Sequence, residues 1–268
     1  MMLPPLVLCG IRGRVRFLPY VLIPIGALLL IFREFALPLL IVAVFFLIPG
    51  ALMGELYRRD SPARTVLAAG VLTIVGELLL GILLSYAFQF DPIRELQRML
   101  WDNYNAMPSI MKEQISEDIM EASIRMFLQM IPLFMIASGV YYAVISHVIG
   151  HRVLKQYGVP ARGFPPIRQW MLPKSLVFYY LIALFLDLFV PKSFDSVMTT
   201  ILLNGIPVLT AAFIVQAISF LLFLSHTKRR WAAALPVIGI VAAPFLPSVV
   251  SLLGVMDVAF PLRKRIQP

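Results

Sequence analysis

Long runs of apolar residues, each about as long as one bilayer crossing, recur along this chain of 268 residues. A membrane-spanning helix needs about 20 mainly apolar residues, because in hydrocarbon every backbone amide must find its partner within the segment. Hydrophobic residues make up 60% of the chain and charged residues only 14%, whereas soluble domains have about 25% charged residues. The sequence therefore predicts an all-α, polytopic membrane bundle that forms a single integral membrane domain over residues 1–268.

Seven apolar stretches are candidate membrane segments: 17–32, 35–55, 65–90, 127–150, 175–190, 196–225 and 231–258. The first and fifth are short, and the first contains Pro19 and Pro24, which kink or interrupt a helix. The last contains Pro236, Pro244 and Pro247, so it is either one broken helix or a hairpin. The apolar run at residues 1–9 precedes the first arginines, which is not the order of a cleavable signal peptide. We therefore expect the spans themselves to direct insertion.

The net charge of +9 comes from basic clusters that alternate with the apolar stretches. These clusters lie at residues 12–16, 58–64, 152–174 and 228–230, and all of them fall on one side of the predicted bundle. Lys and Arg are enriched in cytoplasmic loops, so the N-terminus and the 151–172 segment are predicted to be cytoplasmic. The basic residues 263–265 fit that side only if the last segment is a hairpin. The expected partner of these charges is the lipid bilayer and not nucleic acid.

The polar segment 91–125 is predicted to be helical and to lie on the extracytoplasmic side. Apolar residues recur there every three or four positions, which is typical of an amphipathic helix. Asp91 and Pro92 suit a helix start, and Pro108 is expected to divide the segment into two helices. The pair either lies along the membrane surface or forms a solvated hairpin. By contrast, the 151–172 segment contains too many prolines for a continuous helix, and Trp170 suits the interface.

Three short motifs stand out: LIPGALMG at 47–54, GFPPIRQWMLPKS at 163–175 and GVMDVAFPLRKR at 254–265. Together they resemble the YybS-like family of bacterial multi-pass membrane proteins, also called domain of unknown function 2232. The resemblance implies a bacterial cytoplasmic (inner) membrane location. By analogy of fold, it also points to the substrate-binding subunits of energy-coupling-factor transporters and to a rod-shape morphogenesis protein. Relative to that family, the chain is expected to lack an N-terminal helix, and Pro261 to Arg263 depart from the usual ending.

Glu77 stands near the middle of the third candidate span, where a charged carboxylate costs about 2.5 kcal/mol or more. It is a candidate ligand-binding or proton-relay residue; the simpler alternative is a neutral acid hydrogen-bonded to a neighbouring helix. Gln216, Asn204 and Tyr141 are further candidate ligand-binding residues, although intramembrane amides often only join helices and aromatics often only pack.

The sequence shows no recognisable catalytic machinery. His147 and His151 share a helix face but lack a third metal ligand, and no Walker A, dinucleotide-binding or GxSxG motif occurs. We therefore expect no enzyme activity, metal or cofactor. The first functional hypothesis is a small-molecule binding or transport component, with a cytoplasmic or membrane protein partner docking on Arg162, Arg168 and Lys174. The alternative is a non-transporting scaffold for cell-envelope growth or division. An intramembrane enzyme would need a second polar group beside Glu77.

Overall fold

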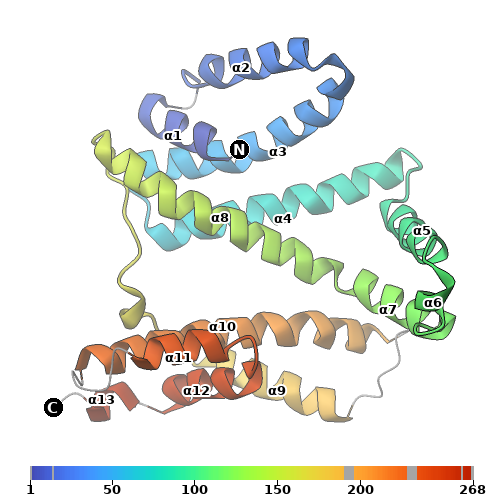
Figure 1. Ribbon diagram of the computed structural model, residues 1–268. Coiled ribbons are helices and arrows are strands. Elements are labelled where there is room, and N and C mark those ends of the chain that lie inside the picture. Colours follow the sequence, from blue (N-terminus) through green and yellow to red (C-terminus); the bar gives the residue numbers. More distant parts are fainter. Residues whose placement is uncertain (1, 14, 190–195, 228–233, 261, 267–268) are drawn as a thin grey trace. The chain divides into compact units, whose positions relative to one another are not determined.

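Helices form all the regular structure in the described residues of the computed structural model, which are 2–13, 15–189, 196–227, 234–260 and 262–266 (Figure 1). In chain order they are α1 (Leu3–Arg12), α2 (Leu18–Ile31), the 3-10 turn η1 (Arg33–Phe35), α3 (Ala36–Arg58), α4 (Ala63–Ala87), α5 (Pro92–Asn105), α6 (Ser109–Lys112), α7 (Glu117–Gln129), α8 (Ile131–Gln156), the 3-10 turn η2 (Ile167–Gln169), α9 (Ser175–Phe189), α10 (Val197–Thr227), α11 (Ala234–Ala242), α12 (Pro247–Ala259) and α13 (Leu262–Ile266). Of the predicted basic clusters, Arg14 and residues 228–230 lie outside the described residues.

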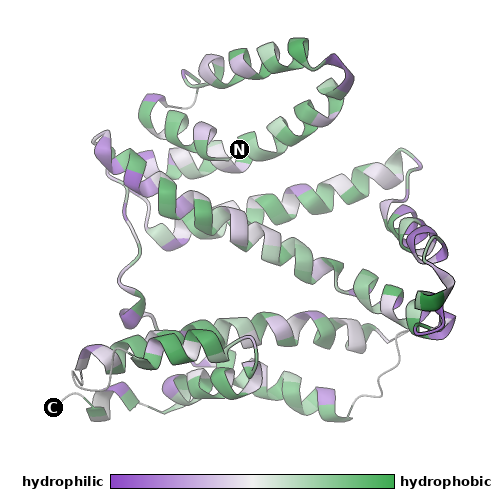
Figure 2. Cartoon of the chain, in the orientation of Figure 1, coloured by the Kyte–Doolittle hydropathy of each residue, from purple (hydrophilic) through white to green (hydrophobic). Residues whose placement is uncertain are grey.

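In the part of the chain that the structure describes, four helical segments are long and apolar enough to cross a bilayer: Arg33–Arg58, α4, α8 and α10. In Arg33–Arg58 and in α4, only 17% of an apolar stretch of 18 residues is buried within the protein. The apolar side chains of these two segments therefore mostly face outward. Figure 2 shows hydrophobic residues along these helices and polar residues gathered at turns and over α5 to α7. This confirms the predicted helical membrane bundle.

The remaining apolar stretches form shorter helices. As predicted, the first is short, since α2 has 14 residues. The fifth contains α9, which covers Ser175–Phe189 among the described residues. The last stretch is divided into α11 and α12. Pro247 stands in the first turn of α12, where a backbone N–H would have no partner within the helix. The apolar N-terminal run, to which the sequence assigned no helix, is the helix α1.

The polar region after α4 contains three helices and not the two expected. Asp91 caps α5 as predicted, since its Oδ1 accepts the N–H groups of Ile93 (3.1 Å) and Arg94 (2.9 Å). The predicted break at Pro108 is also present. A second break follows α6, because the Ser116 side chain accepts the N–H of Ile119 and so starts a new helix, α7.

Contacts divide the chain into two compact units. The N-terminal unit comprises 1–103 and 134–164, and the C-terminal unit comprises 104–133 and 165–268. In the N-terminal unit, α1 lies against α3 at Gly50 and Gly54, where an added Cβ would overlap the α1 backbone. Small residues permit this close approach of two helices. Leu6 of α1 is thereby fully buried in a core with Met53, Tyr57, Val66, Ile74 and Leu154.

In the C-terminal unit, α9, α10 and α12 share a core of Val177, Tyr180, Phe213, Val255 and Val258. Gly254 of α12 lies so close to α10 that a Cβ there would overlap the Phe213 carbonyl oxygen. α11 and α12 form a hairpin beside α10 (Figure 1), which decides between the two forms that the sequence allowed. Asp257, near the end of α12, consequently reaches Gln216 in the C-terminal half of α10.

Candidate functional site: a buried polar network

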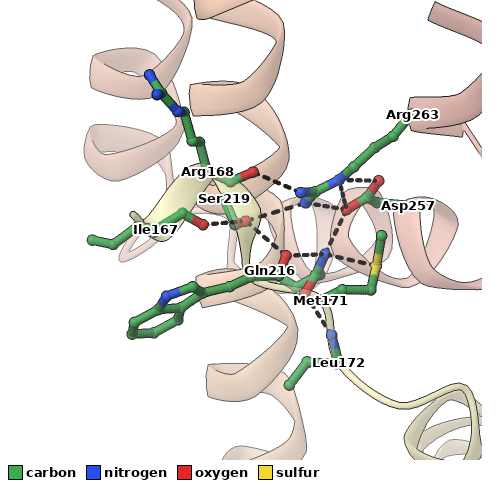
Figure 3. Close-up of polar contacts among 9 residues, drawn as sticks. Ile167, Arg168, Met171, Leu172, Gln216, Ser219, Asp257 and Arg263 are labelled. Carbon is green, nitrogen blue, oxygen red and sulfur yellow. Dashed lines mark hydrogen bonds and ion pairs between the residues drawn. The ribbon is translucent and has the colours of Figure 1, made fainter. Parts of the chain in front are cut away.

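Gln216 and Asp257 form the centre of a polar network in the C-terminal unit (Figure 3). Each is only 1% exposed, although both stand on otherwise apolar helices, α10 and α12. Gln216 Nε2 donates a hydrogen bond of 2.5 Å to Asp257 Oδ2. Buried polar groups are costly unless paired, so the two side chains hold the hairpin against α10.

Arg263, in α13, neutralises Asp257. Its Nη2 lies 2.6 Å from Asp257 Oδ2, and the side chains of Arg263 and Asp257 are 12% and 0% exposed. Its Nη1 donates to the carbonyl oxygen of Arg168 at 2.7 Å, and its Nη2 also lies 3.1 Å from the Ser219 hydroxyl. The guanidinium thus joins α13, α12, α10 and the segment around η2. A buried ion pair with this many further hydrogen bonds is well compensated for its loss of hydration.

The network also holds the proline-rich segment that leads into α9. Gln216 Oε1 accepts the Leu172 N–H at 3.0 Å. The Ser219 hydroxyl lies 2.6 Å from the Ile167 carbonyl oxygen and 3.0 Å from that of Trp170. Prolines keep this segment from satisfying its backbone groups as a regular helix. Side chains of α10 therefore supply the missing partners and fix the segment in place.

A cavity of about 200 Å³ opens beside the network. It is lined by Met171, Leu172, Lys174, Asp257, Val258, Phe260 and Arg263. Lys174 is exposed and makes no ion pair among the described residues. The cavity wall therefore carries two cationic side chains and one carboxylate, and that carboxylate is already paired with Arg263. This balance suits a small anion.

Of the predicted ligand-binding residues, only Gln216 belongs to this network. Asn204 lies about 18 Å away along α10 and donates to Gln129 O (2.8 Å) while accepting the Leu133 N–H (2.8 Å), so it joins α10 to the α7–α8 junction. Tyr141 of α8, in the N-terminal unit, is 61% exposed. These candidates thus lie in separate environments.

Glu77 lies on α4 in the N-terminal unit. Both of its carboxyl oxygens are shielded from solvent, and neither has a hydrogen-bond partner among the described residues. A Cβ at the flanking Gly76 or Gly81 would have no described atom of another element within 4 Å, so these glycines do not mark a close helix contact. Glu77 therefore stays a predicted site.

The three predicted docking residues differ in their surroundings. The Arg162 guanidinium is engaged by Asp60, with Nε donating to Oδ1 at 2.8 Å. Arg168 contributes only its carbonyl to the network, and its guanidinium points away (Figure 3). Lys174 lines the cavity. Of the three, Arg168 has the side chain directed away from the contacts around it.

Sequence reasoning did not single out Ser219, Asp257 or Arg263 as site residues. A lone acid within the apolar stretch 247–259 was a usable signal, by the same argument that selected Glu77. Arg263 was counted as part of a basic tail. Its partner six residues earlier is not on the same face of a continuous helix, so spacing alone would not have paired them.

A second buried pair lies in the N-terminal unit. The Tyr57 hydroxyl of α3 is 2.5 Å from His147 Nδ1 of α8. The His147 ring stacks on His151 at 5.4 Å and meets Phe164 edge to face at 4.9 Å. The pair satisfies two buried polar groups and ties α8 to α3.

Comparisons with known proteins agree with the resemblance to the YybS-like family. The profile of the family described as "Predicted membrane protein (DUF2232)" matches residues 1–258. The protein printed as "Uncharacterized protein YybS" from Bacillus subtilis (strain 168) is 22% identical over 238 residues, which cover 85% of this chain and 76% of that protein. No solved structure matches the chain.

Proposed function

Because the chain belongs to the DUF2232 family of predicted membrane proteins, we propose that it is a small-molecule binding component of the bacterial cytoplasmic membrane. Its ligand is a small anion, held in the cavity beside Lys174 and Arg263. In this role the protein serves transport as a membrane-embedded binding subunit and does not itself catalyse a reaction. A cytoplasmic or membrane protein partner supplies any energy, since no nucleotide-binding motif occurs in the sequence.

The charge balance of the cavity carries this proposal. The Asp257 carboxylate is neutralised by Arg263, so the Lys174 ammonium adds a positive charge that no described carboxylate offsets. Met171, Leu172, Val258 and Phe260 provide apolar walls. Mostly apolar pockets with a few placed polar groups are typical of small-molecule sites.

The orientation of Arg168 favours a docking role for the same segment. Its carbonyl is fixed by Arg263, while its guanidinium is directed away from the network (Figure 3). An anchored backbone with an outward cation suits recognition of an acidic surface. The partner is the energising subunit in a transport role. In the alternative role of scaffold for envelope growth or division, it is a component of that machinery.

Thermal unfolding of the detergent-purified protein with added anions tests the proposal. Inorganic phosphate, pyrophosphate and short mono- and dicarboxylates are suitable probes. A ligand at a hundred times its dissociation constant stabilises the folded state by about 2.7 kcal/mol, so a binding anion should raise the melting temperature. Lys174→Gln should abolish that rise. Lys155→Gln removes another exposed lysine, at the end of α8, and should preserve it.

Equal responses of the two lysine variants would exclude the cavity as the site. The absence of a response to every anion, together with co-purification of a protein partner in native mass spectrometry, would favour the scaffold role instead.

A further inference from the structure

An apolar groove lies between α1, α2 and α3 in the N-terminal unit. It encloses about 280 Å³, and we call it the α2 groove. Pro5 of α1, Pro24 and Leu28 of α2, and Leu39 and Phe46 of α3 contribute to its walls. Along α2 only Val21 is buried, so the helix stands off from α3 and leaves carbon surface open between them. An acyl chain has the chemistry to fill such a space.

The groove has a cationic end. Tyr20 lines it there, and Arg12 Nη1 donates to the Tyr20 hydroxyl at 2.8 Å. The Arg12 guanidinium also lies over the Tyr20 ring, 3.9 Å from its centroid. Arg16 is exposed in the turn that precedes α2. Neither arginine is paired with a carboxylate among the described residues, so both charges are available to an anion.

The opposite end of the groove, at Leu28 and Leu39, is apolar. From Tyr20 to Leu28 the groove follows α2 for about 12 Å, at 1.5 Å per residue. A groove with apolar walls and a cationic side chain at one end fits an amphiphile with an anionic head group. A water-soluble anion would leave the walls unfilled, and a neutral lipid would leave the arginines without a counter-charge.

We propose that the α2 groove binds one acyl chain of an anionic phospholipid, with its phosphate at Arg12. Basic pockets between helices on the cytoplasmic side of a membrane recognise anionic head groups in this way. The bound chain fills the gap beside α2 and holds this short helix against α3. This site is separate from the anion cavity of the C-terminal unit, and neither proposal depends on the other.

Titration of the delipidated protein with lipids in native mass spectrometry tests the site. The probes are phosphatidylglycerol and phosphatidylcholine with the same acyl chains. The wild type should retain one phosphatidylglycerol in preference to phosphatidylcholine. Removing one arginine should weaken phosphatidylglycerol binding about fivefold, the value of one basic side chain near a membrane surface. Arg12→Gln should therefore lower the preference, since the choline cation of phosphatidylcholine offsets its phosphate and makes the loss for that lipid smaller.

Filling the groove tests the acyl-chain half of the proposal. Ala43→Phe places a ring among the groove walls and should lower retention of both lipids. Leu40, on the same helix, is 43% exposed and does not line the groove. Leu40→Phe is therefore the matched control and should bind both lipids as the wild type does. Circular dichroism shows whether Ala43→Phe folds, and Arg12→Gln tests the site at an exposed position if it does not. Equal binding of the two lipids by the wild type, or unchanged preference in Arg12→Gln, would overturn the proposal.

Discussion

Asp60 and Arg162 form an ion pair that joins two turns 102 residues apart in the chain. Asp60 follows α3 in the left-handed backbone conformation (φ 55°), and Arg162 follows α8. The pair places the α3–α4 turn and the end of the 157–164 stretch at the same end of the N-terminal unit. The predicted topology requires this arrangement, since it assigns both turns to the cytoplasm.

We expect Asp60→Asn to remove an acid-sensitive part of the stability. Hydrogen bonding from Arg162 holds the pKa of Asp60 below its ordinary value, which is about 3.9. The pair therefore stabilises the folded state above that pH, and its contribution is lost as the pH falls through the lower pKa of the folded state. Melting temperatures of wild type and Asp60→Asn should differ at neutral pH and converge in acid. A pH-independent difference would mean that another role of Asp60 dominates.

We expect Arg263→Met to be among the most destabilising changes in the C-terminal unit. It would leave the buried Asp257 carboxylate without a counter-charge, and breaking such a pair costs about 3–5 kcal/mol. The double variant Asp257→Asn/Arg263→Met should regain part of the loss, because no uncompensated charge remains. Denaturant unfolding in micelles measures the free energy of unfolding of Arg263→Met and of the double variant. A double variant that is less stable than Arg263→Met would show that the two residues do not act as a pair.

We expect Gly254→Leu to force α12 away from α10. Its Cβ would overlap the Phe213 carbonyl oxygen, and overpacking a tight contact costs about 1–3 kcal/mol. Gly205→Ala is the matched control on α10, since nothing lies within 4 Å of a Cβ there. The melting temperature should fall clearly in Gly254→Leu and change little in Gly205→Ala. A stable Gly254→Leu would mean that the two helices can separate without cost.

We expect Glu77→Gln to be tolerated. Neither carboxyl oxygen of Glu77 has a hydrogen-bond partner within the described ranges of the chain, and burying a charged carboxylate costs more than burying a neutral amide. The melting temperature at neutral pH should stay the same or rise. A decrease would reveal a partner that only a carboxyl group can satisfy, and would turn attention back to a binding role for this residue.

We expect a membrane-impermeant maleimide, added from outside, to label Ser109→Cys and spare Tyr157→Cys. This follows from the cytoplasmic assignment of the basic loops. Both positions are exposed, whereas Gly158 has a φ of +76° that a cysteine would strain. The native Cys9 is buried, so background labelling should be low. The opposite labelling pattern would reverse the predicted orientation.

The sequence predicted those parts of the fold that depend on local pattern. Apolar length located the long helices, and the Asp91 cap and the Pro108 break follow from neighbouring residues. α1 was missed because ten residues are too few for a span, and only its contact with Gly50 and Gly54 of α3 explains its burial.

Only part of the candidate site could be predicted, because only part of it depends on local sequence pattern. Gln216 was found because an amide inside an apolar helix stands out from its sequence neighbours. Asp257 and Arg263 required knowledge of the hairpin, which brings the end of α12 back to α10. Nothing local in the sequence decided between a hairpin and one broken helix.

The shortness of α2 has a consequence for the membrane around the protein. A helix of 14 residues extends only about 21 Å, whereas the hydrocarbon core is about 30 Å thick. This hydrophobic mismatch should draw the two leaflets toward each other beside α2. The protein should therefore partition into thinner bilayer regions, and lipids with long acyl chains should disfavour its insertion.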